Sequence, residues 1–484
     1  MKVLTELEPK GVFYFFEEIC RIPHGSGNVE QISDFLVEFA KERNLIYRQD
    51  ELKNVMIEKP ASKGYEQEPA VILQGHMDMV AVKKPGLQKD MKTEGLDVRV
   101  NGDKIYAEGT SLGGDDGIAV AYALAILADD TLAHPRLEVV ITVDEEIGMD
   151  GARGIDLSAL TGKRMLNLDS EEEGIFLTSC AGGARVNCHL PLGQEEKNGQ
   201  VFRISVEGLL GGHSGEAIDK ERGNANCILG RLIYSITQEI PVNLISLEGG
   251  LADNAIPRQA VAEIVINRDD YQRLQKVIIE REAEIGKELV VKDPDFQVTV
   301  VSEGESRVLC ADQKSTEMAA AFLLSLPNGV QAMSADIKEL VETSLNLGIM
   351  KYSTDSKQLT CSFSVRSCME SAKQNLIAKL KAITDIVQGS VTVNGDYPGW
   401  AYRADSPLRD KMVALYEEMY GRKPELMAIH AGLECGILAS KIENLDCISF
   451  GPNMENIHTT EETLSISSTK RVWEYLINLL KKKG

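Results

Sequence analysis

Side chains that can bind metal ions or move protons stand directly after the most apolar segments of this chain. Three segments rich in Val, Ile, Leu and Met predict buried strands, and each is followed by an acid or a histidine. A glycine-rich loop and a late Gly-Pro turn add two further candidates, Asp115 and His458. The full set of candidates is His76, Asp78, Asp115, Glu145, Glu146, Asp169 and His458. The carboxyl ends of strands form the ligand crevice of an open α/β sheet. The sequence therefore predicts that separate segments bring imidazoles and carboxylates to one sheet edge.

Carboxylates that directly follow buried strands are costly to bury unless they meet a positive charge or a metal ion. Two imidazoles and three carboxylates suit two divalent ions that share one bridging carboxylate. Zinc accepts this mixture of nitrogen and oxygen ligands, and cobalt or manganese can occupy the same ligands. We expect Asp115, near the start of a predicted helix, to be the bridge. Of Glu145 and Glu146, one is expected to bind metal and the other to take the proton from a metal-bound water.

The elements that must position these residues alternate along the first part of the chain. Residues 71–75, 137–143 and 164–168 predict strands, and residues 118–128 predict an apolar helix, with Asp115 and Asp116 at its N-cap. Continuous apolar strands separated by helices indicate a mostly parallel sheet that is covered on both faces. The pattern returns late in the chain as a helix at 408–420, a strand at 447–450 and a helix at 469–482.

The middle of the chain has a different pattern, with strands that alternate apolar and polar residues, such as 201–207 and 260–266. The order strand, turn, strand, helix occurs at 243–282 and again at 342–383, which suggests an internal duplication. We predict one discontinuous α/β domain, residues 1–182 and 397–484, interrupted by an inserted α/β domain at 183–396.

Composition excludes several classes of protein. The chain has 484 residues and a formal net charge of −22, which disfavours nucleic acid or an anionic membrane as a partner. No apolar run is long enough to span a bilayer, and acids interrupt the N-terminal segment, so no signal peptide is expected. The nine cysteines include no Cys-x-x-Cys pair, which argues against a disulfide framework and a zinc ribbon. These features predict a cytoplasmic protein.

Several stretches resemble the di-zinc peptidase–aminoacylase superfamily: H-M-D, G-G-D-D-G, D-E-E-x-G, N-L-D-S-E and the late G-P…H. Within it, five segments are similar to the bacterial aminoacyl-histidine (Xaa-His) dipeptidases. They are V-I-L-Q-G-H-M-D-M-V (71–80), C-A-G-G-A-R (180–185), L-L-G-G-H-S-G (209–215), D-N-A-I-P-R (253–258) and I-H-A-G-L-E-C-G (429–436). The resemblance covers nearly the whole chain. It implies a di-zinc-peptidase catalytic domain, and it identifies the insert as a lid or dimerisation domain, with a homodimer formed through it.

The resemblance also implies a role for each candidate. The metal ligands would be His76, Asp115, Glu146, Asp169 and His458, with Asp115 as the bridge. Glu145 would be the general base and later the acid, and Asp78 would fix the ring of His76. In the insert, His213 would stabilise the oxyanion, Asn254 and Arg366 would hold the terminal carboxylate of the substrate, and His430 and Gly432 would lie near the substrate. Asp116 follows the bridging position where many relatives carry Asn, and it either competes as a ligand or caps the helix.

The sequence thus predicts a metallo-dipeptidase that hydrolyses small unblocked dipeptides and favours Xaa-His substrates. A water that bridges two metal ions, most simply zinc, would be activated by Glu145. The alternatives are a broader dipeptidase or an N-acyl amino acid deacylase on the same site. A binding protein that keeps the fold without activity is disfavoured because every proposed ligand and the base are present.

Overall fold

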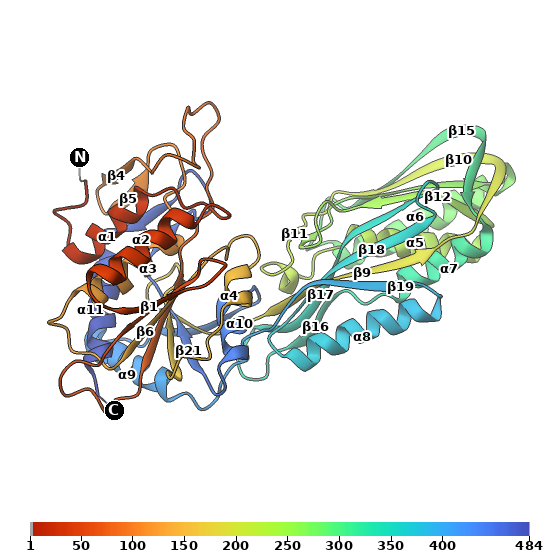
Figure 1. Ribbon diagram of the computed structural model, residues 1–484. Helices are drawn as coiled ribbons and strands as arrows, with labels where there is room; N and C mark the ends of the chain where they lie inside the picture. The colour runs from red at the N-terminus through yellow and green to blue at the C-terminus, as the bar shows by residue number, and fades with distance from the viewer. Residues whose placement is uncertain (1–2, 484) are drawn as a thin grey trace. The chain divides into compact units, whose positions relative to one another are not determined.

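In the computed structural model, which describes residues 3–483, the predicted apolar strands are neighbours in one eight-stranded sheet (Figure 1). Its strands, in order across the sheet, are β1 (Ile46–Gln49), β2 (Val55–Lys59), β6 (Leu137–Thr142), β3 (Val71–His76), β7 (Arg164–Asn167), β21 (Asp446–Ser449), β8 (Ile175–Cys180) and β20 (Glu425–Ile429). The four central strands β6, β3, β7 and β21 are parallel, and the pairs β1–β2, β2–β6 and β21–β8 are antiparallel. The parallel centre agrees with the burial of every residue of β6, β3 and β21.

Helices bury the apolar strands of this sheet. They are α1 (Lys10–Cys20), α2 (Glu30–Glu42), α3 (Gly114–Ala128), α4 (Asp150–Gly154), α9 (Pro407–Tyr420), α10 (Glu434–Lys441) and α11 (Ile466–Lys481). Helix α3 is apolar on every side and buried along its length, as expected of a helix inside a core. A small four-stranded sheet also contributes: β22 (Met454–Glu455), β23 (Thr463–Ser465), β5 (Lys104–Ala107) and β4 (Val98–Asn101).

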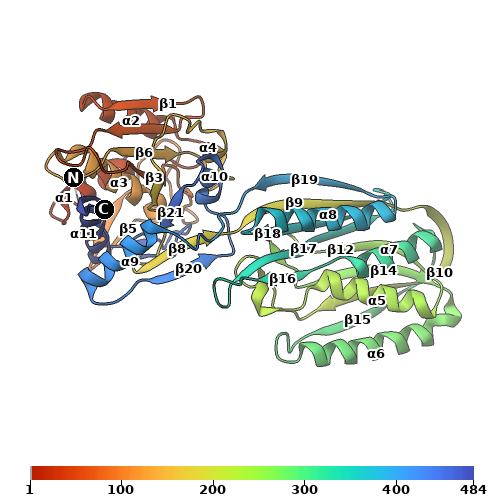
Figure 2. The same cartoon turned by 90° about the horizontal axis from the view of Figure 1, so that it is seen from below.

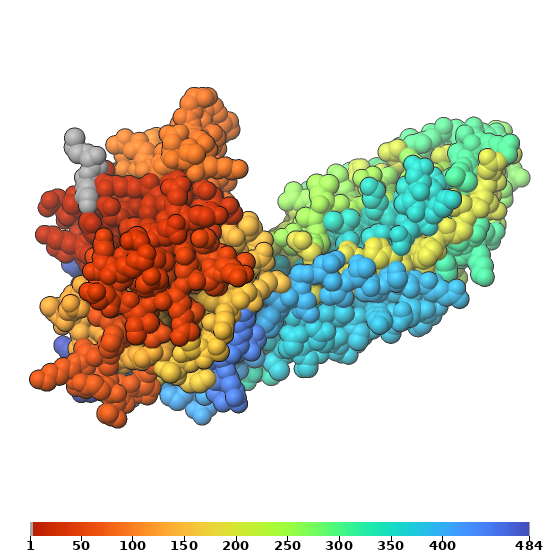
Figure 3. Space-filling view, viewed as in Figure 1, coloured from red at the N-terminus to blue at the C-terminus, as the bar shows by residue number. Residues whose placement is uncertain are grey.

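The chain divides into two compact units. The first contains the described residues up to Ser179, together with Tyr402–Ala428 and those from Leu433 onward, and the second contains Cys180–Ala401 and Ile429–Gly432. The insert was predicted at 183–396, and the second unit runs from Cys180 to Ala401 and also contains the short segment 429–432. The first unit is therefore built from both ends of the chain, and Figure 3 shows blue C-terminal atoms beside red and orange N-terminal ones.

The second unit contains a nine-stranded sheet. Its main strands, in order, are β15 (Gln297–Ala311), β10 (Gln194–Glu207), β14 (Ala260–Ile266), β12 (Val242–Gly249), β17 (Val341–Ser353), β18 (Gln358–Ser367), β9 (Gly182–Pro191) and β19 (Ser390–Tyr397); β16 (Gly329–Met333) pairs with β17. The helices α5 (Ala225–Glu239), α6 (Tyr271–Leu289), α7 (Gln313–Ser325) and α8 (Glu370–Ile386) run along it (Figure 2). The order strand, strand, helix occurs twice, as β12–β14–α6 and β17–β18–α8, as predicted.

The alternating sequence of these strands follows from the one-sided packing. Every second residue of β10, at Phe202, Ile204 and Val206, joins the core beneath the helices, whereas Val201 belongs to a separate small cluster. Among the described residues, no helix is long and apolar enough to cross a membrane.

Candidate metal centre and substrate-binding residues

The parallel register of the first sheet brings the predicted strand-end residues together. His76, the last residue of β3, pairs with Thr142 of β6, and Gln74 pairs with Asn167 of β7. Since the three strands run in the same direction, the segments that follow them leave the sheet at the same edge. These segments carry Asp78, then Glu145 and Glu146, then Asp169, as the sequence predicted.

Asp115 reaches this edge from the loop that opens α3. Gly113 has φ +66°, a left-handed conformation that favours glycine, and a Cβ there would lie 2.7 Å from Met79 Sδ. The prediction that Asp115 or Asp116 caps the helix is wrong. The N-cap residue is Gly113, and no side-chain hydrogen bond caps the helix there. Both acids have non-helical backbone angles, which leaves Asp115 free to turn towards the histidines.

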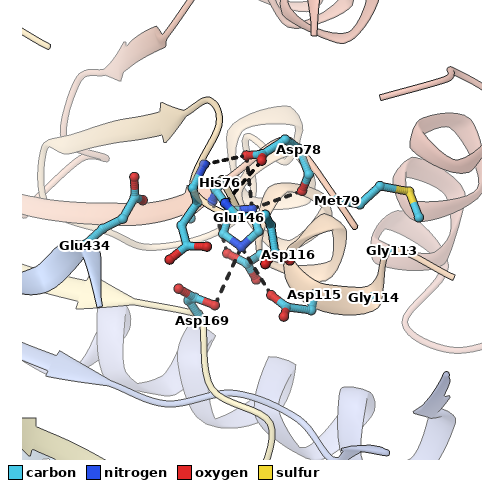
Figure 4. A network of polar contacts seen from close by, with 12 residues as sticks. His76, Asp78, Met79, Gly113, Gly114, Asp115, Asp116, Glu146, Asp169 and Glu434 are labelled. Carbon is cyan, nitrogen blue, oxygen red and sulfur yellow. Dashed lines mark hydrogen bonds and ion pairs between the residues drawn. The ribbon is translucent and has the colours of Figure 1, made fainter. Parts of the chain in front are cut away.

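Asp115 lies between the two predicted histidine ligands. Its Oδ1 is 3.2 Å from His76 Nε2 (Figure 4), and its Oδ2 is 3.0 Å from His458 Nε2. Asp169 Oδ1 is 3.8 Å from His76 Nε2, and Glu146 Oε1 is 2.8 Å from His458 Nε2. Each histidine therefore has one acid of its own and shares Asp115 with the other.

Three groups of side chains in this cluster could each hold a metal ion, because their ligand atoms lie within 4.8 Å of one another. The groups are His76 with Asp116 and Asp169, His76 with Glu145 and Glu146, and Asp115 with Glu146 and His458. The structure thus brings all five predicted ligands together. It also places Asp116, fully buried and with no hydrogen-bond partner for Oδ1, in the same cluster.

The crowding of acids perturbs their protonation. Burial raises the pKa of Glu145 to about 8, and the neighbouring Glu434, Glu146 and Asp115 carboxylates act in the same direction. Burial likewise raises the pKa of Asp169 well above its ordinary value. His458 shows the complementary effect, because hydrogen bonds with Asp115 and Glu146 raise the pKa of its imidazole to about 10. The cluster carries more negative charge than its own histidines balance.

Asp78 connects the elements around the cluster. Its backbone carbonyl lies 3.0 Å from His76 Nδ1, and its carboxylate lies 3.4 Å from the same nitrogen. The carboxylate also accepts hydrogen bonds from Ser26 Oγ and from the backbone N–H of Glu145. Asp78 is thus placed to orient the His76 ring and the start of the Glu145 loop together.

Two buried acids were not singled out in the sequence. Glu434, at the start of α10, accepts hydrogen bonds from Gln74 Nε2 and Thr142 Oγ1, and its Oε1 has no hydrogen-bond partner within residues 3–483. Glu462 accepts hydrogen bonds from the backbone of the Asp115 loop. Glu434 lies in the segment I-H-A-G-L-E-C-G, which could have drawn attention to it. Glu462 is one of two adjacent acids in a predicted loop, and nothing in the sequence marks it.

The predicted substrate-binding residues lie in the second unit, where they form a cluster of their own. Arg366, on β18, is buried, and its Nε has no hydrogen-bond partner among the described residues. Its register partner on β17, Ser344, is hydrogen-bonded with His430 Nε2 at 2.7 Å. Burial, followed by the charge of Arg366, lowers the pKa of His430 to about 4. Burial, followed by Arg366, also lowers the pKa of His213.

The loop that carries His213 packs beside the turn that carries Asn254. The short strands β11 (Gly212–His213) and β13 (Ala255–Ile256) pair, and the N–H of Ser214 donates to the Asn254 carbonyl at 2.8 Å. A Cβ on Gly215 would lie 2.9 Å from the His430 carbonyl oxygen and 3.1 Å from His213 Cε1. Gly432 leaves room for Tyr397, whose hydroxyl would be 2.8 Å from a Cβ there. An unpaired guanidinium nitrogen beside two imidazoles suits a carboxylate ligand.

Comparison with known proteins shows extensive similarity. The family model described as peptidase family M20/M25/M40 matches residues 72–482. The cytosol non-specific dipeptidase of Escherichia coli (strain K12) is 34% identical over 483 residues, which are 99% of each chain. The aminoacylhistidine dipeptidase from Vibrio alginolyticus superposes with a TM-score of 0.92 at 33% identity, over 99% of this chain and 98% of that one. The aminopeptidase PepT from Bacillus cereus shares the fold, with a TM-score of 0.57 at 17% identity over 98% of each chain.

Proposed function

This chain belongs to peptidase family M20/M25/M40 and is a metal-dependent dipeptidase, and from that premise we propose how its side chains divide the work. The observation that carries the proposal is the position of Asp115. Its two carboxylate oxygens face two different histidines, at 3.2 Å and 3.0 Å. A carboxylate in this position suits two divalent ions held side by side.

The donor set fits such a pair of ions. His76 and Asp169 would hold one ion, His458 and Glu146 the other, and Asp115 both. The raised pKa of Asp169 and the unpartnered Oδ1 of Asp116 both indicate negative charge that lacks a counter-charge. Zinc suits these nitrogen and oxygen donors best, and cobalt or manganese are the alternatives.

Bound ions would supply Lewis-acid chemistry, polarising the peptide carbonyl and making a water more acidic. Glu145 would take a proton from the attacking water and pass it to the amine that leaves when the peptide bond breaks. Asp78 would keep the His76 ring in place through the contacts at its Nδ1.

We assign substrate binding to the second-unit cluster. Arg366 and Asn254 would hold the terminal carboxylate of the dipeptide, and His213 would stabilise negative charge on the carbonyl oxygen. His430 and Gly432 would line the same cluster. In this proposal the inserted unit serves as lid and dimerisation domain, the protein is a homodimer, and it works in the cytoplasm, as the name of its Escherichia coli relative says of that protein.

We propose that Xaa-His dipeptides are favoured substrates. Two relatives resemble the whole chain at more than 30% identity: one is named a non-specific dipeptidase and the other an aminoacylhistidine dipeptidase. Broad dipeptidase activity is therefore the main alternative, and deacylation of N-acyl amino acids on the same site is the second.

A substrate panel separates these alternatives. The protein is stripped with chelator, reloaded with zinc, cobalt or manganese, and assayed with Xaa-His dipeptides, other dipeptides, tripeptides and N-acyl amino acids. We expect hydrolysis of unblocked dipeptides, fastest for Xaa-His. Equal rates on all dipeptides would favour the broad enzyme, and cleavage of N-acyl amino acids alone would favour the deacylase. A fully active chelated protein would refute the metal centre.

A further inference from the structure

Glu462 is a buried carboxylate, 3% exposed, that faces the backbone of the Asp115 loop. Its Oε2 accepts hydrogen bonds from the N–H groups of Leu112 and Gly113, at 2.8 Å and 3.1 Å. Its Oε1 accepts from the N–H of Gly114 at 2.8 Å and, at 3.5 Å, from that of Asp115. Both oxygens are therefore occupied by amides of four successive residues.

Two of these amides, those of Gly114 and Asp115, belong to the first residues of α3, where a helix leaves its N–H groups without partners inside the helix, and the other two belong to the loop before it. With no side-chain cap at Gly113, the distant Glu462 supplies the acceptors for these N–H groups. Burial and the nearby Asp115 carboxylate raise the pKa of Glu462, and the hydrogen bonds from the loop amides oppose that rise.

The two loop glycines make this approach feasible. A Cβ on Gly114 would lie 3.3 Å from Glu462 Oε1 and 3.2 Å from Met454 Sδ, closer than side chains ordinarily pack. Gly113 adopts its left-handed conformation at the turn itself. Figure 4 shows these glycines directly beside Asp115, so the backbone that Glu462 holds is the backbone that aims this carboxylate.

Glu462 and His458 belong to one short segment. Glu462 comes just before β23, whose Leu464 pairs with Ile105 of β5, and four residues after His458. This segment thus contacts the Asp115 loop twice: His458 Nε2 is 3.0 Å from Asp115 Oδ2, and Glu462 binds the loop backbone. Side chain and backbone of Asp115 are held by the same few residues.

We infer that Glu462 is a positioning residue, which sets Asp115 relative to His458 and thereby sets the affinity of the centre for metal. The inference rests on the proposed function in one respect, that Asp115 and His458 bind metal. Glu462 does not itself bind the ion, because its oxygens are used by the loop amides.

The test compares E462Q with E461Q. Glutamine places an NH₂ group against some of the loop N–H groups and removes the charge. Glu461 is the matched control, since its side chain is 66% exposed and pairs with Lys84 at 2.7 Å. We expect zinc affinity, measured by competition with a chelator, to fall about 10- to 100-fold in E462Q and to stay within about twofold in E461Q. In metal-free protein, the amides of residues 112–115 should exchange hydrogen about tenfold faster in E462Q.

Melting of the metal-free variants shows whether they are folded, and E462D, which keeps the charge on a shorter side chain, is expected to have intermediate affinity. Zinc affinity in E462Q equal to that of E461Q would overturn the inference, even if the melting temperature fell, because Glu462 would then only stabilise the fold. A wild-type protein that binds no zinc would refute the metal centre. In that case, unchanged amide exchange at 112–115 would also refute the positioning of the loop.

Discussion

Lowering the pH from about 7.5 to about 5 should destabilise the second unit through one side chain, His430, by about 2 kcal/mol. Burial, assisted by the charge of Arg366, lowers the pKa of this imidazole from 6.5 to about 4 in the folded protein. The carboxylate of Asp219 and a backbone hydrogen bond oppose the shift without cancelling it. In the unfolded chain the imidazole would titrate near its ordinary value.

The sign follows from where the proton binds. Between pH 4 and 6.5 the unfolded state binds a proton at His430 and the folded state does not, so acid favours unfolding. The stability is fully present above pH 6.5 and is lost as the pH falls from 6.5 towards 4. The full difference of about 2.5 pKa units corresponds to about 3 kcal/mol, of which about 2 kcal/mol is reached at pH 5.

The measurement is urea unfolding at each pH, followed by fluorescence of Trp400. The chain has two tryptophans, and Trp473 belongs to the first unit, so a Trp473→Phe background leaves Trp400 to report on the second. His430→Asn removes the titrating group. The comparison uses the change in unfolding free energy between the two pH values, in the variant and in the parent. The effect of the substitution itself on stability cancels in this comparison, and so do the contributions of the other titrating groups.

The parent should lose about 2 kcal/mol more than the variant between the two pH values. A difference under about 0.5 kcal/mol would refute the reasoning. It would mean that His430 binds a proton in the folded unit nearly as readily as in the unfolded chain.

Three further results are expected. Glu145→Gln should lower kcat by about 10²- to 10⁴-fold while the metal content by mass spectrometry stays at the wild-type level; full activity would remove Glu145 as the base. Arg366→Met should raise KM for free dipeptides by about 10- to 100-fold but leave KM for dipeptide amides, which lack the carboxylate, unchanged; an equal effect on both would contradict the clamp. Stripping the metal should abolish activity and lower the melting temperature, and zinc at about 100 times its Kd should restore about 2.7 kcal/mol of stability, since the ion offsets the charge around Asp115 and Asp169. A melting temperature that does not respond to zinc would count against that site.

Many strands and helices of the first unit could be predicted from local sequence. Every residue of the strand Val71–His76 is buried because both faces of the sheet are covered, and the apolar run Val71–Leu73 with which it begins is distinctive. His76 and Asp169 were placed at one sheet edge because parallel strands share their carboxyl ends. Only residue types and their position after a strand were needed for that step.

The start of α3 was predicted wrongly for a tertiary reason. An acid before an apolar helix usually caps it, so Asp115 and Asp116 read as capping residues. In the structure the loop amides are satisfied by Glu462, which is far away in sequence, and both acids lie in the groups of side chains that could hold a metal ion. Nothing local distinguishes Glu462 from its exposed neighbour Glu461.

The sequence by itself therefore predicted most of the candidate site residues, the parallel sheet that gathers them and the family. It could not determine which acid faces which histidine, because that depends on the packing of loops that are hundreds of residues apart. Only the tertiary structure showed that Asp115 lies between His76 and His458, that Glu434 is buried beside Gln74, and that Glu462 holds the loop. The local sequence around a carboxylate can be the same whether the side chain is exposed to solvent or buried in a core. Only the fold decides in which of these environments the carboxylate lies.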